Sequence, residues 1–220
     1  MSNATKGAVN GNGSPETRTT GFPKAPLERT NEEKVMQLLK ERKKDEIVAM
    51  GKDALPALAG ALKAWDSDIR ERASAIIKKM AKEQPKEDWK ETIAALGEAL
   101  GNENEYVQEN IGYAIEKIVK AHPEYDWSKI VPVLVERAEH GNEYVRGEMV
   151  WTIGELAKKN SHYDWSTAVG ALEKLLDDAF EYTRNGATWA IAMIAFDHPE
   201  LISPELRARV KASDFGFQMP

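Results

Sequence analysis

The sequence predicts an all-α solenoid built from about four two-helix repeats. The dipeptide Asp-Trp occurs at residues 88–89, 126–127 and 164–165, so successive copies are separated by 38 residues without insertion or deletion. Self-similarity at a period of this size indicates stacked supersecondary units. No strand-length segment alternates apolar and polar residues, so no sheet is predicted. Other columns keep the same interval, as in Leu58, Leu96, Leu134 and Leu172.

The N-terminal segment divides into a tail and a cap. Residues 1–29 are rich in Gly, Thr, Asn and Pro and hold too few large apolar side chains to offset the entropy of ordering, so a flexible tail is expected. Thr30 is followed three residues later by Glu33, which is the spacing of a capping box at the start of a helix. We therefore expect a helical N-terminal cap over residues 30–52, outside the 38-residue pattern.

Each repeat is expected to hold two amphipathic helices. Asp88, Asp126 and Asp164 mark the starts of first helices, because a carboxylate can accept hydrogen bonds from the free amides of a first turn, and Glu91 would complete a capping box with Asp88. Apolar residues recur at helical spacing in both halves of a unit, as in Ile93, Leu96 and Leu100 and then in Val107, Ile111, Ala114, Ile115 and Ile118. The expected repeats are 53–89, 90–127, 128–165 and 166–203.

Residues 204–220 are expected to form a C-terminal capping helix, near 204–210, and a tail. In the last repeat Met193 and Phe196 occupy columns that hold Lys or Glu in earlier repeats, and a helix that is apolar on nearly all sides is normally covered. The tail carries Phe215, Phe217 and Met219 at alternating positions. It either folds back as a cap over Met193 and Phe196 or reaches a neighbouring subunit and builds an assembly.

A polar turn followed by Ile or Val, then Arg, occurs at residues 66–70 and 142–146, in the first case ahead of a helical apolar run. Pro56 and Pro132 lie 76 residues apart in the first helices of their units. Over residues 53–203 these features resemble the HEAT family of α-solenoids. The resemblance implies an α-α superhelix whose second helices line the concave surface. It also implies a role in binding proteins, since only a minority of the family are enzymes.

Composition restricts the class of partner. The formal net charge is −6, and the segments 1–30 and 204–220 carry +2 and +1, which leaves −9 on the repeats. An acidic surface repels phosphate backbones, so we expect a protein or peptide partner, one with basic residues, rather than a nucleic acid. The chain has no cysteine and no apolar run of the roughly 20 residues that span a bilayer, and we expect a cytoplasmic protein.

Two aromatic columns recur at the 38-residue interval and stand seven residues apart, so the two rings of a repeat share one helix face. The rings either form a ladder on the concave surface, left open by Gly147, Gly154 and Gly186, or pack against the neighbouring repeat. With nearby carboxylates they would suit a peptide carrying Lys or Arg. The candidate partner-binding residues are Tyr106, Tyr113, Tyr144, Glu148, Trp151, Glu155, Tyr182 and Trp189.

Two other functional classes remain open beside a protein-binding scaffold. Residues 106–113 and the helices of Trp151 and Trp189 are similar to DNA alkylation repair glycosylases built from HEAT-like repeats, which implies a base-excision activity centred on Trp151, Glu155 and Trp189. A structural subunit of a homo-oligomeric assembly is the third class. The segments 122–124 and 198–200 both read His-Pro-Glu at one repeat position, which indicates turns rather than metal ligands. We expect no catalytic residue, cofactor or metal.

Overall fold

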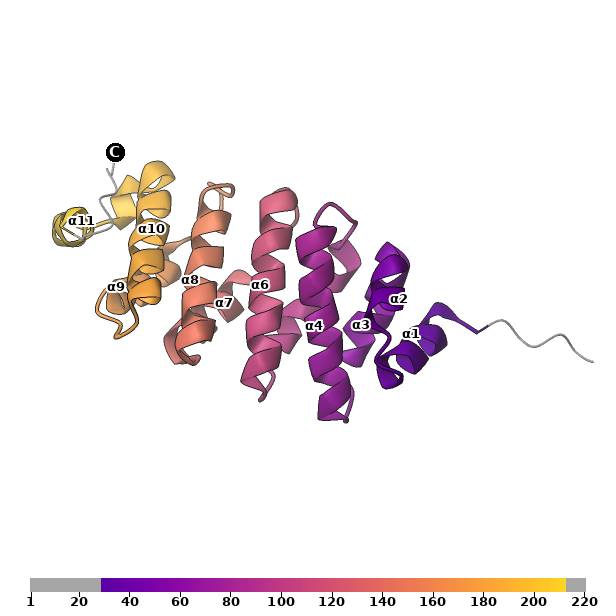
Figure 1. The fold of residues 1–220 in the computed structure, drawn as a ribbon. Helices are drawn as coiled ribbons and strands as arrows, with labels where there is room; N and C mark the ends of the chain where they lie inside the picture. Colours follow the sequence, from indigo (N-terminus) through magenta and orange to yellow (C-terminus); the bar gives the residue numbers. More distant parts are fainter. Residues whose placement is uncertain (1–28, 213–220) are drawn as a thin grey trace, which may run out of the picture.

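The computed structural model describes residues 29–212 as one row of helices (Figure 1), and no strand occurs within that range. None of these helices combines the length and apolar character needed to cross a membrane. In chain order the elements are α1 (Asn31–Lys40), α2 (Lys44–Ala49), η1 (Gly51–Ala54), α3 (Leu55–Ala61), α4 (Ser67–Glu83), η2 (Lys90–Thr92), α5 (Ile93–Ala99), α6 (Glu105–Ala121), α7 (Val131–His140), α8 (Glu143–Ala157), α9 (Ser166–Leu175), α10 (Glu181–Asp197), η3 (Pro199–Leu201) and α11 (Pro204–Lys211).

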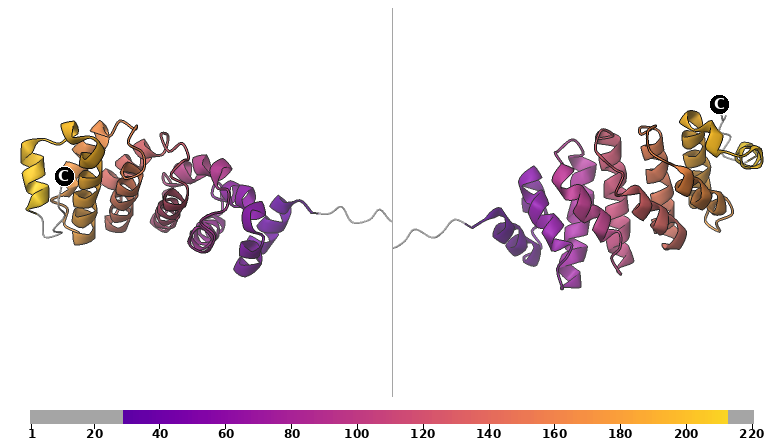
Figure 2. Two further views of the ribbon diagram at one scale, coloured as in Figure 1. Left: turned by 90° about the horizontal axis from the view of Figure 1, so that it is seen from above. Right: turned by 180° about the vertical axis from the view of Figure 1, so that it is seen from behind.

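The repeats stack in two layers. The second helices of the units, α4, α6, α8 and α10, lie side by side in front, and the shorter first helices lie behind them (Figure 1). Seen from above, the row bends gently with the second helices on the inner side (Figure 2, left). We therefore call the surface formed by α4, α6, α8 and α10 the inner face. The predicted all-α solenoid is confirmed.

Side-chain caps begin five of the eleven α-helices in residues 29–212, namely α1, α4, α6, α8 and α11. Thr30 and Glu33 make both bonds of the predicted capping box at the start of α1. Asp88, Asp126 and Asp164 each accept a hydrogen bond from the amide two residues later, at 3.0–3.1 Å. They do not cap α5, α7 and α9 as predicted, because the N-cap residues there are Thr92, Ile130 and Trp165. The predicted capping box of Asp88 with Glu91 is wrong, because the 3-10 turn η2 follows Asp88 and α5 begins only at Ile93.

The three Asp-Trp tryptophans lie in the core. Trp89, Trp127 and Trp165 are buried, as the strict interval predicted. Each indole Nε1 donates a hydrogen bond to the backbone carbonyl five residues earlier, at 3.1–3.4 Å, in the turn that ends the preceding repeat. The same side chain therefore fills apolar space and satisfies a turn carbonyl at every junction between repeats.

A column of long polar side chains holds the turn inside each repeat. Arg70, Arg146 and Arg184 donate from their guanidinium groups to carbonyls of the turn just before their own helix. Gln108, at the same position of the second repeat, donates to the carbonyl of Asn102. This column of three Arg and one Gln therefore holds the turns inside the repeats.

The C-terminal helix α11 leaves part of the last repeat uncovered. Met193 is half-buried, whereas Phe196 is 70% exposed with α11 in place. Phe215, Phe217 and Met219 lie outside the described residues. Their contact with Met193 and Phe196, within one chain or between two, stays a prediction.

Replacing Trp127 with Ala should lower the free energy of unfolding by about 3–5 kcal/mol, the usual cost of truncating a buried Trp. Trp65→Ala is the matched control, because Trp65 is fully exposed on the turn between α3 and α4. Denaturant titration followed by circular dichroism would measure both. An unchanged midpoint for Trp127→Ala would contradict a structural role for the Asp-Trp column.

Deleting residues 213–220 separates the two roles predicted for the tail. A self-cap predicts that the shortened chain aggregates, since Met193 and Phe196 would be uncovered. A tail exchanged between subunits predicts dissociation of an assembly into monomers. Light scattering on both chains distinguishes these results, and a monomer of unchanged mass and stability would contradict both.

Candidate functional site

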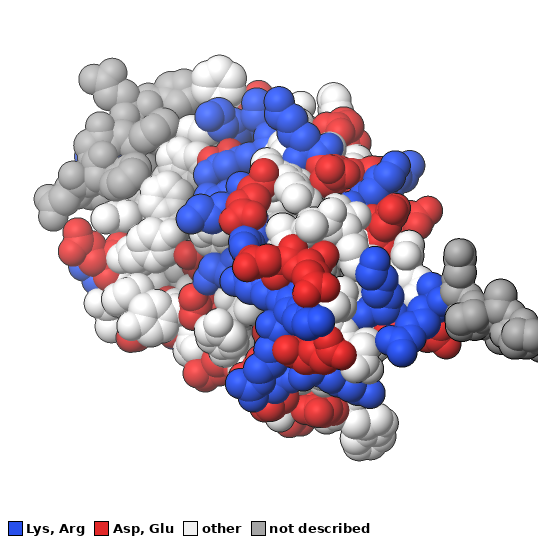
Figure 3. Space-filling view, turned by 45° about the vertical axis from the view of Figure 1, so that its right-hand side comes forward, with Lys and Arg blue, Asp and Glu red and all other residues white. Residues whose placement is uncertain are grey.

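The inner face changes character along the solenoid. Figure 3 shows acidic and basic side chains interleaved over the middle and N-terminal part of the molecule, whereas the C-terminal part, at the left, is largely uncharged. All eight residues predicted to bind a partner lie on α6, α8 and α10. Among them Tyr106, Tyr144 and Tyr182 are exposed, and Tyr113, Glu148, Trp151, Glu155 and Trp189 are half-buried.

Five rings of α8 and α10, and of the turn before α10, form one connected group, here called the aromatic cluster. The ring centroids of Trp151 and Trp189 are 5.0 Å apart, and those of Trp151 and Tyr182 are 5.7 Å apart. Phe180 lies 5.8 Å from Tyr144 and 6.5 Å from Tyr182, again measured between centroids. The cluster therefore bridges two repeats and runs from the inner face to the ends of the helices.

Phe180 was not among the predicted site residues. It precedes α10 at the position where Asn104 and Asn142 cap α6 and α8. The loss of the capping Asn in an otherwise regular column is the signal that could have identified it. Asp178 accepts from the amide of Phe180 at 2.8 Å, as Asn102 does from the amide of Asn104, so α10 begins without a side-chain cap.

The glycines of this region seat the rings, so the prediction that Gly147, Gly154 and Gly186 leave them open is wrong. A Cβ atom at Gly154 would lie 2.4 Å from the Trp189 ring, and one at Gly147 would lie 2.5 Å from the Tyr182 ring. At Gly186 a Cβ would lie 3.0 Å from the Trp151 indole nitrogen. One face of each ring thus rests on the neighbouring helix backbone.

Tyr113 stands apart from the aromatic cluster. The ammonium groups of Lys78 and Lys117 lie 5.1 Å and 4.6 Å from its ring centroid. Lys78 also pairs with Glu109 at 3.4 Å, so α4 and α6 are linked by charge at this point. The ring of Tyr113 is therefore already occupied by the protein's own cations.

Lysines pair with three of the six carboxylates on α6 and α8, namely Glu109, Glu116 and Glu155. Lys120 binds Glu116 and also reaches Glu155 on the next helix at 3.3 Å. Burial alone would raise the pKa of Glu116, but hydrogen bonds and charges from Lys117 and Lys120 outweigh it and hold this pKa below its usual value. Glu155 is therefore part of an internal ion-pair network.

Glu148 lies where the charged part of the inner face meets the aromatic cluster. Burial, and next the charge of Glu116, raise its pKa, and Lys78 and Lys117 oppose this only in part. Within residues 29–212 no Lys, Arg or His approaches the Glu148 carboxylate to ion-pair distance. Burial, together with the charges of Glu148 and Glu116, raises the pKa of Tyr182 to about 12. Glu148 is thus a shielded carboxylate that would gain from a cation.

The two His-Pro-Glu segments lie between repeats, the first in a turn and the second running into the 3-10 helix η3. His122 contacts Glu124 at 3.0 Å and stacks on Tyr125, and His198 contacts Glu200 at 3.1 Å. Each His-Pro-Glu segment follows the end of a second helix, and the first lies in a turn as predicted, whereas Pro199 and Glu200 belong to η3. Across residues 29–212 no three His, Asp or Glu side chains converge in a way that could hold a metal ion.

No protein-family model matches this chain, and neither does the sequence of any curated protein. Solved structures do match. A crystal structure of an engineered protein has a TM-score of 0.62 at 19% identity and covers 83% of each chain. A designed armadillo repeat protein in complex with the peptide (KR)4 has a TM-score of 0.60 at 22% identity, and the match covers 86% of this chain and 98% of that one.

A second designed armadillo repeat protein gives a TM-score of 0.58 at 22% identity, over 87% of this chain and 90% of that one. These likenesses show the fold, which is a HEAT-like helical solenoid as the sequence predicted. They do not show the likeness to DNA alkylation repair glycosylases.

Replacing Gly154 with Ala should destabilise the protein by about 1–3 kcal/mol, the usual cost of overpacking. The added methyl would meet the Trp189 ring on one side and lie 3.2 Å from the Ala190 backbone on the other. Gly170→Ala is the control, because no atom lies within 4 Å of a Cβ there and Ala in the interior of α9 should gain about 0.5–1 kcal/mol. Thermal unfolding measures both, and equal shifts would contradict the seating of Trp189 on Gly154.

Proposed function

We propose that this protein is a non-enzymatic, protein-binding scaffold whose inner face takes a peptide or an exposed segment of a partner carrying Lys or Arg. The observation that carries the proposal is the aromatic cluster beside Glu148. The rings of Trp151, Tyr182 and Trp189 are held on one side by glycine backbone and are partly open on the other. Packed but accessible Tyr and Trp side chains are the usual anchors of protein interfaces.

The rings would supply most of the affinity. Tyr and Trp offer a large contact area and lose little rotamer freedom on binding, because they have only two side-chain torsions. Their mutual packing reduces that loss further, since each ring is already positioned by its neighbours. A partner side chain that covers Trp151 and Trp189 therefore meets a preorganised surface.

Glu148 would select the charge of the partner. A Lys or Arg placed over the aromatic cluster would contact both ring faces and this carboxylate, and both attract cations. A hydrogen bond to a charged group is worth about 1.5–3 kcal/mol. The other carboxylates nearby, Glu116 and Glu155, already bind lysines of the protein.

The fold comparison supports the proposal in a general way. A solenoid of similar architecture, the designed armadillo repeat protein described above, is found in complex with the peptide (KR)4. At 22% identity its binding residues do not transfer to this chain. The likeness supports only the idea that two layers of stacked helices offer a surface on which a basic peptide can lie.

No specific observation favours a base-excision enzyme. The two tryptophans assigned to that centre, Trp151 and Trp189, pack on each other, and Glu155 pairs with Lys120. An assembly subunit would need a contact at the uncovered Phe196, and deletion of the tail tests that role.

The test uses fluorescein-labelled peptides that combine an aromatic residue with Arg, with Gln in place of Arg, or with Glu in place of Arg. Fluorescence anisotropy should rank the Arg peptide first on the unmodified protein. Trp151→Ala with Trp189→Ala should weaken that binding at least tenfold, or about 1.4 kcal/mol. Phe196→Ala is the control, because this exposed ring is not part of the aromatic cluster, and circular dichroism checks that each variant is folded.

Glu148→Gln should remove the preference for Arg over Gln while leaving the aromatic contribution. Affinity for the Arg peptide should also fall as the pH drops through the raised pKa of Glu148, because the protonated carboxyl carries no charge. The variant should lose that dependence. Unchanged binding in the double Trp variant would contradict the proposal, and affinity purification with mass spectrometry would then identify any natural partner.

A further inference from the structure

One edge of the solenoid carries the dipeptide Glu-Tyr three times at the 38-residue interval, at 105–106, 143–144 and 181–182. Each copy opens a second helix, namely α6, α8 and α10. All six side chains are exposed, and the tyrosines reach 51%, 56% and 41% exposure in chain order. We call this surface the Glu-Tyr edge.

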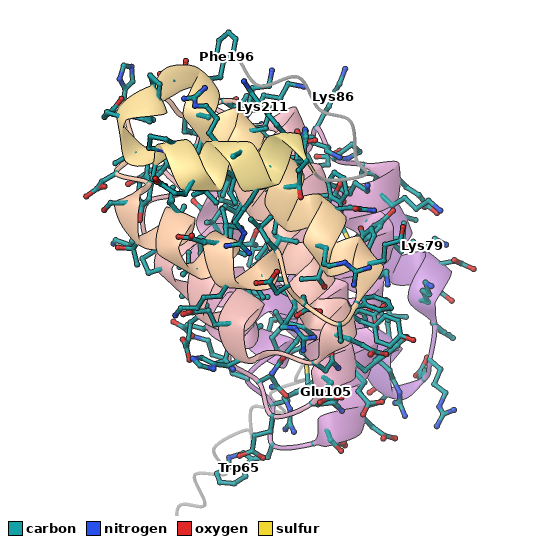
Figure 4. The ribbon with its side chains drawn as sticks, turned by 90° about the vertical axis from the view of Figure 1, so that its left-hand side faces the viewer. Trp65, Lys79, Lys86, Glu105, Phe196 and Lys211 are labelled. Carbon is teal, nitrogen blue, oxygen red and sulfur yellow. The ribbon has the colours of Figure 1, made fainter. Side chains whose placement is uncertain are left out.

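The first repeat places a different ring at the same edge. Trp65, on the turn before α4, is 101% exposed, which makes it the most exposed large apolar side chain of the described residues. Figure 4 looks along the row from its C-terminal end and shows Trp65 and Glu105 together at one end of the second helices, opposite Lys86 and Phe196. An exposed aromatic therefore occurs at this edge in each of four successive repeats.

The cations of this edge are already engaged. Arg70, Arg146 and Arg184 follow the turns, but their guanidinium groups bind turn carbonyls, and Arg146 also forks onto Asp178 at 2.8 and 3.0 Å. In the part of the chain from 29 to 212, Glu105, Glu143 and Glu181 make no ion pair. Three exposed rings thus each follow, in the sequence, a carboxylate that makes no ion pair in residues 29–212.

The fold accounts for the carboxylates but not for the rings. An acidic residue in the first turn stabilises a helix through its dipole, and α1 and α11 also begin with one. A half-exposed Tyr adds little to the core, and the residue after it, such as Val107 or Val145, already fills the buried position. The rings of Tyr106 and Tyr144 are therefore surplus to the core and available for binding, whereas Tyr182 packs on Gly147 and Trp151 with one face and is 41% exposed.

We infer that the Glu-Tyr edge binds an extended, Lys- or Arg-bearing segment of a partner protein, with one cation for each repeat. This inference rests on the proposed function, whose partner it specifies. Each cation would lie over a Tyr ring and beside the adjacent carboxylate. Tyr144 and Tyr182 also belong to the aromatic cluster, so one segment can contact the edge and the inner face without a break.

Repeat geometry sets the spacing of the cations. Packed helices lie about 8–10 Å apart. An extended polyproline II chain rises about 3.1 Å per residue with three residues per turn, so every third side chain returns to the same side after about 9 Å. The matching segment therefore carries Lys or Arg at every third position, and clustered cations of the same number fit less well.

The experiment compares two labelled peptides of equal composition and about four polyproline II turns, one with Arg at every third position and one with all Arg at one end. The edge variant is Glu105→Gln with Glu143→Gln and Glu181→Gln. The charge-matched control is Glu32→Gln with Glu91→Gln and Glu205→Gln, which are exposed, make no ion pair in the described chain and lie at the starts of other helical segments. Anisotropy over a range of salt concentrations gives the affinities.

We expect the unmodified protein to prefer the evenly spaced peptide, and the edge variant to lose about tenfold in affinity for it, since three weak contacts act together. The affinity of the edge variant should also depend less on salt concentration than that of the unmodified protein. The control variant should bind almost as the unmodified protein does. Tyr106→Leu with Tyr144→Leu should also weaken binding, which a charge effect alone would not produce.

Equal losses in the edge and control variants, no preference for spacing, or no binding of either peptide would overturn the inference. An edge variant that binds normally while the Trp151 and Trp189 variant does not would overturn it and leave the proposed function standing. The reverse result would overturn the proposed function instead. If deleting residues 1–28 strengthens peptide binding, the edge is occupied by the chain's own basic segment, and the assignment to a partner protein is wrong.

Discussion

The burial of one tryptophan at each junction between repeats is the interaction on which the rest of this structure depends. A solenoid has no central core, and each unit contacts only its neighbours, so the stack is as stable as its junctions. Trp89, Trp127 and Trp165 meet that need with a large apolar surface and an indole N–H that satisfies a turn carbonyl. Because the Trp must occupy the same position in every repeat, the interval between successive Asp-Trp pairs stays at 38 residues.

In a regular stack, residues at the same position of successive repeats lie next to one another. The residue types at those positions therefore decide whether the inner face is charged or aromatic. In the first two repeats these positions hold Lys and Glu, which pair between helices, as Lys78 does with Glu109. In the last two repeats glycines allow the rings of the next helix to lie on the backbone. The same geometry thus produces an ion-pair network at one end and an aromatic cluster at the other.

Neighbouring positions at the start of each second helix have separate roles. The Arg of the third repeat, Arg146, turns back to its own loop and holds it. Tyr144, two residues earlier, points to solvent and does not contribute to the core. The guanidinium group of Arg146 binds the turn, so it does not pair with Glu143, the acidic residue between the turn and Tyr144. Because the Arg residues are needed to hold the turns, the Glu residues nearby keep a negative charge that is unpaired within residues 29–212.

The sequence alone determined the architecture, the helical content and the burial of the Asp-Trp column. These features follow from the 38-residue interval and from the spacing of apolar residues within each helix. The same pattern occurs in four units, so one irregular residue does not change the prediction. A capping box joins residues three apart, so the one formed by Thr30 and Glu33 could also be predicted. The one expected at Asp88 does not form, because a 3-10 turn follows that residue.

Only the tertiary structure decided which of the predicted site residues act together. It joined Phe180 to the rings, placed Tyr113 under two lysines and paired Glu155 with Lys120. Spacing along one helix shows which side chains share a face. The rotation of that face against the next helix, and the reach of long side chains across the gap, are set by packing between repeats, which no interval within the sequence specifies.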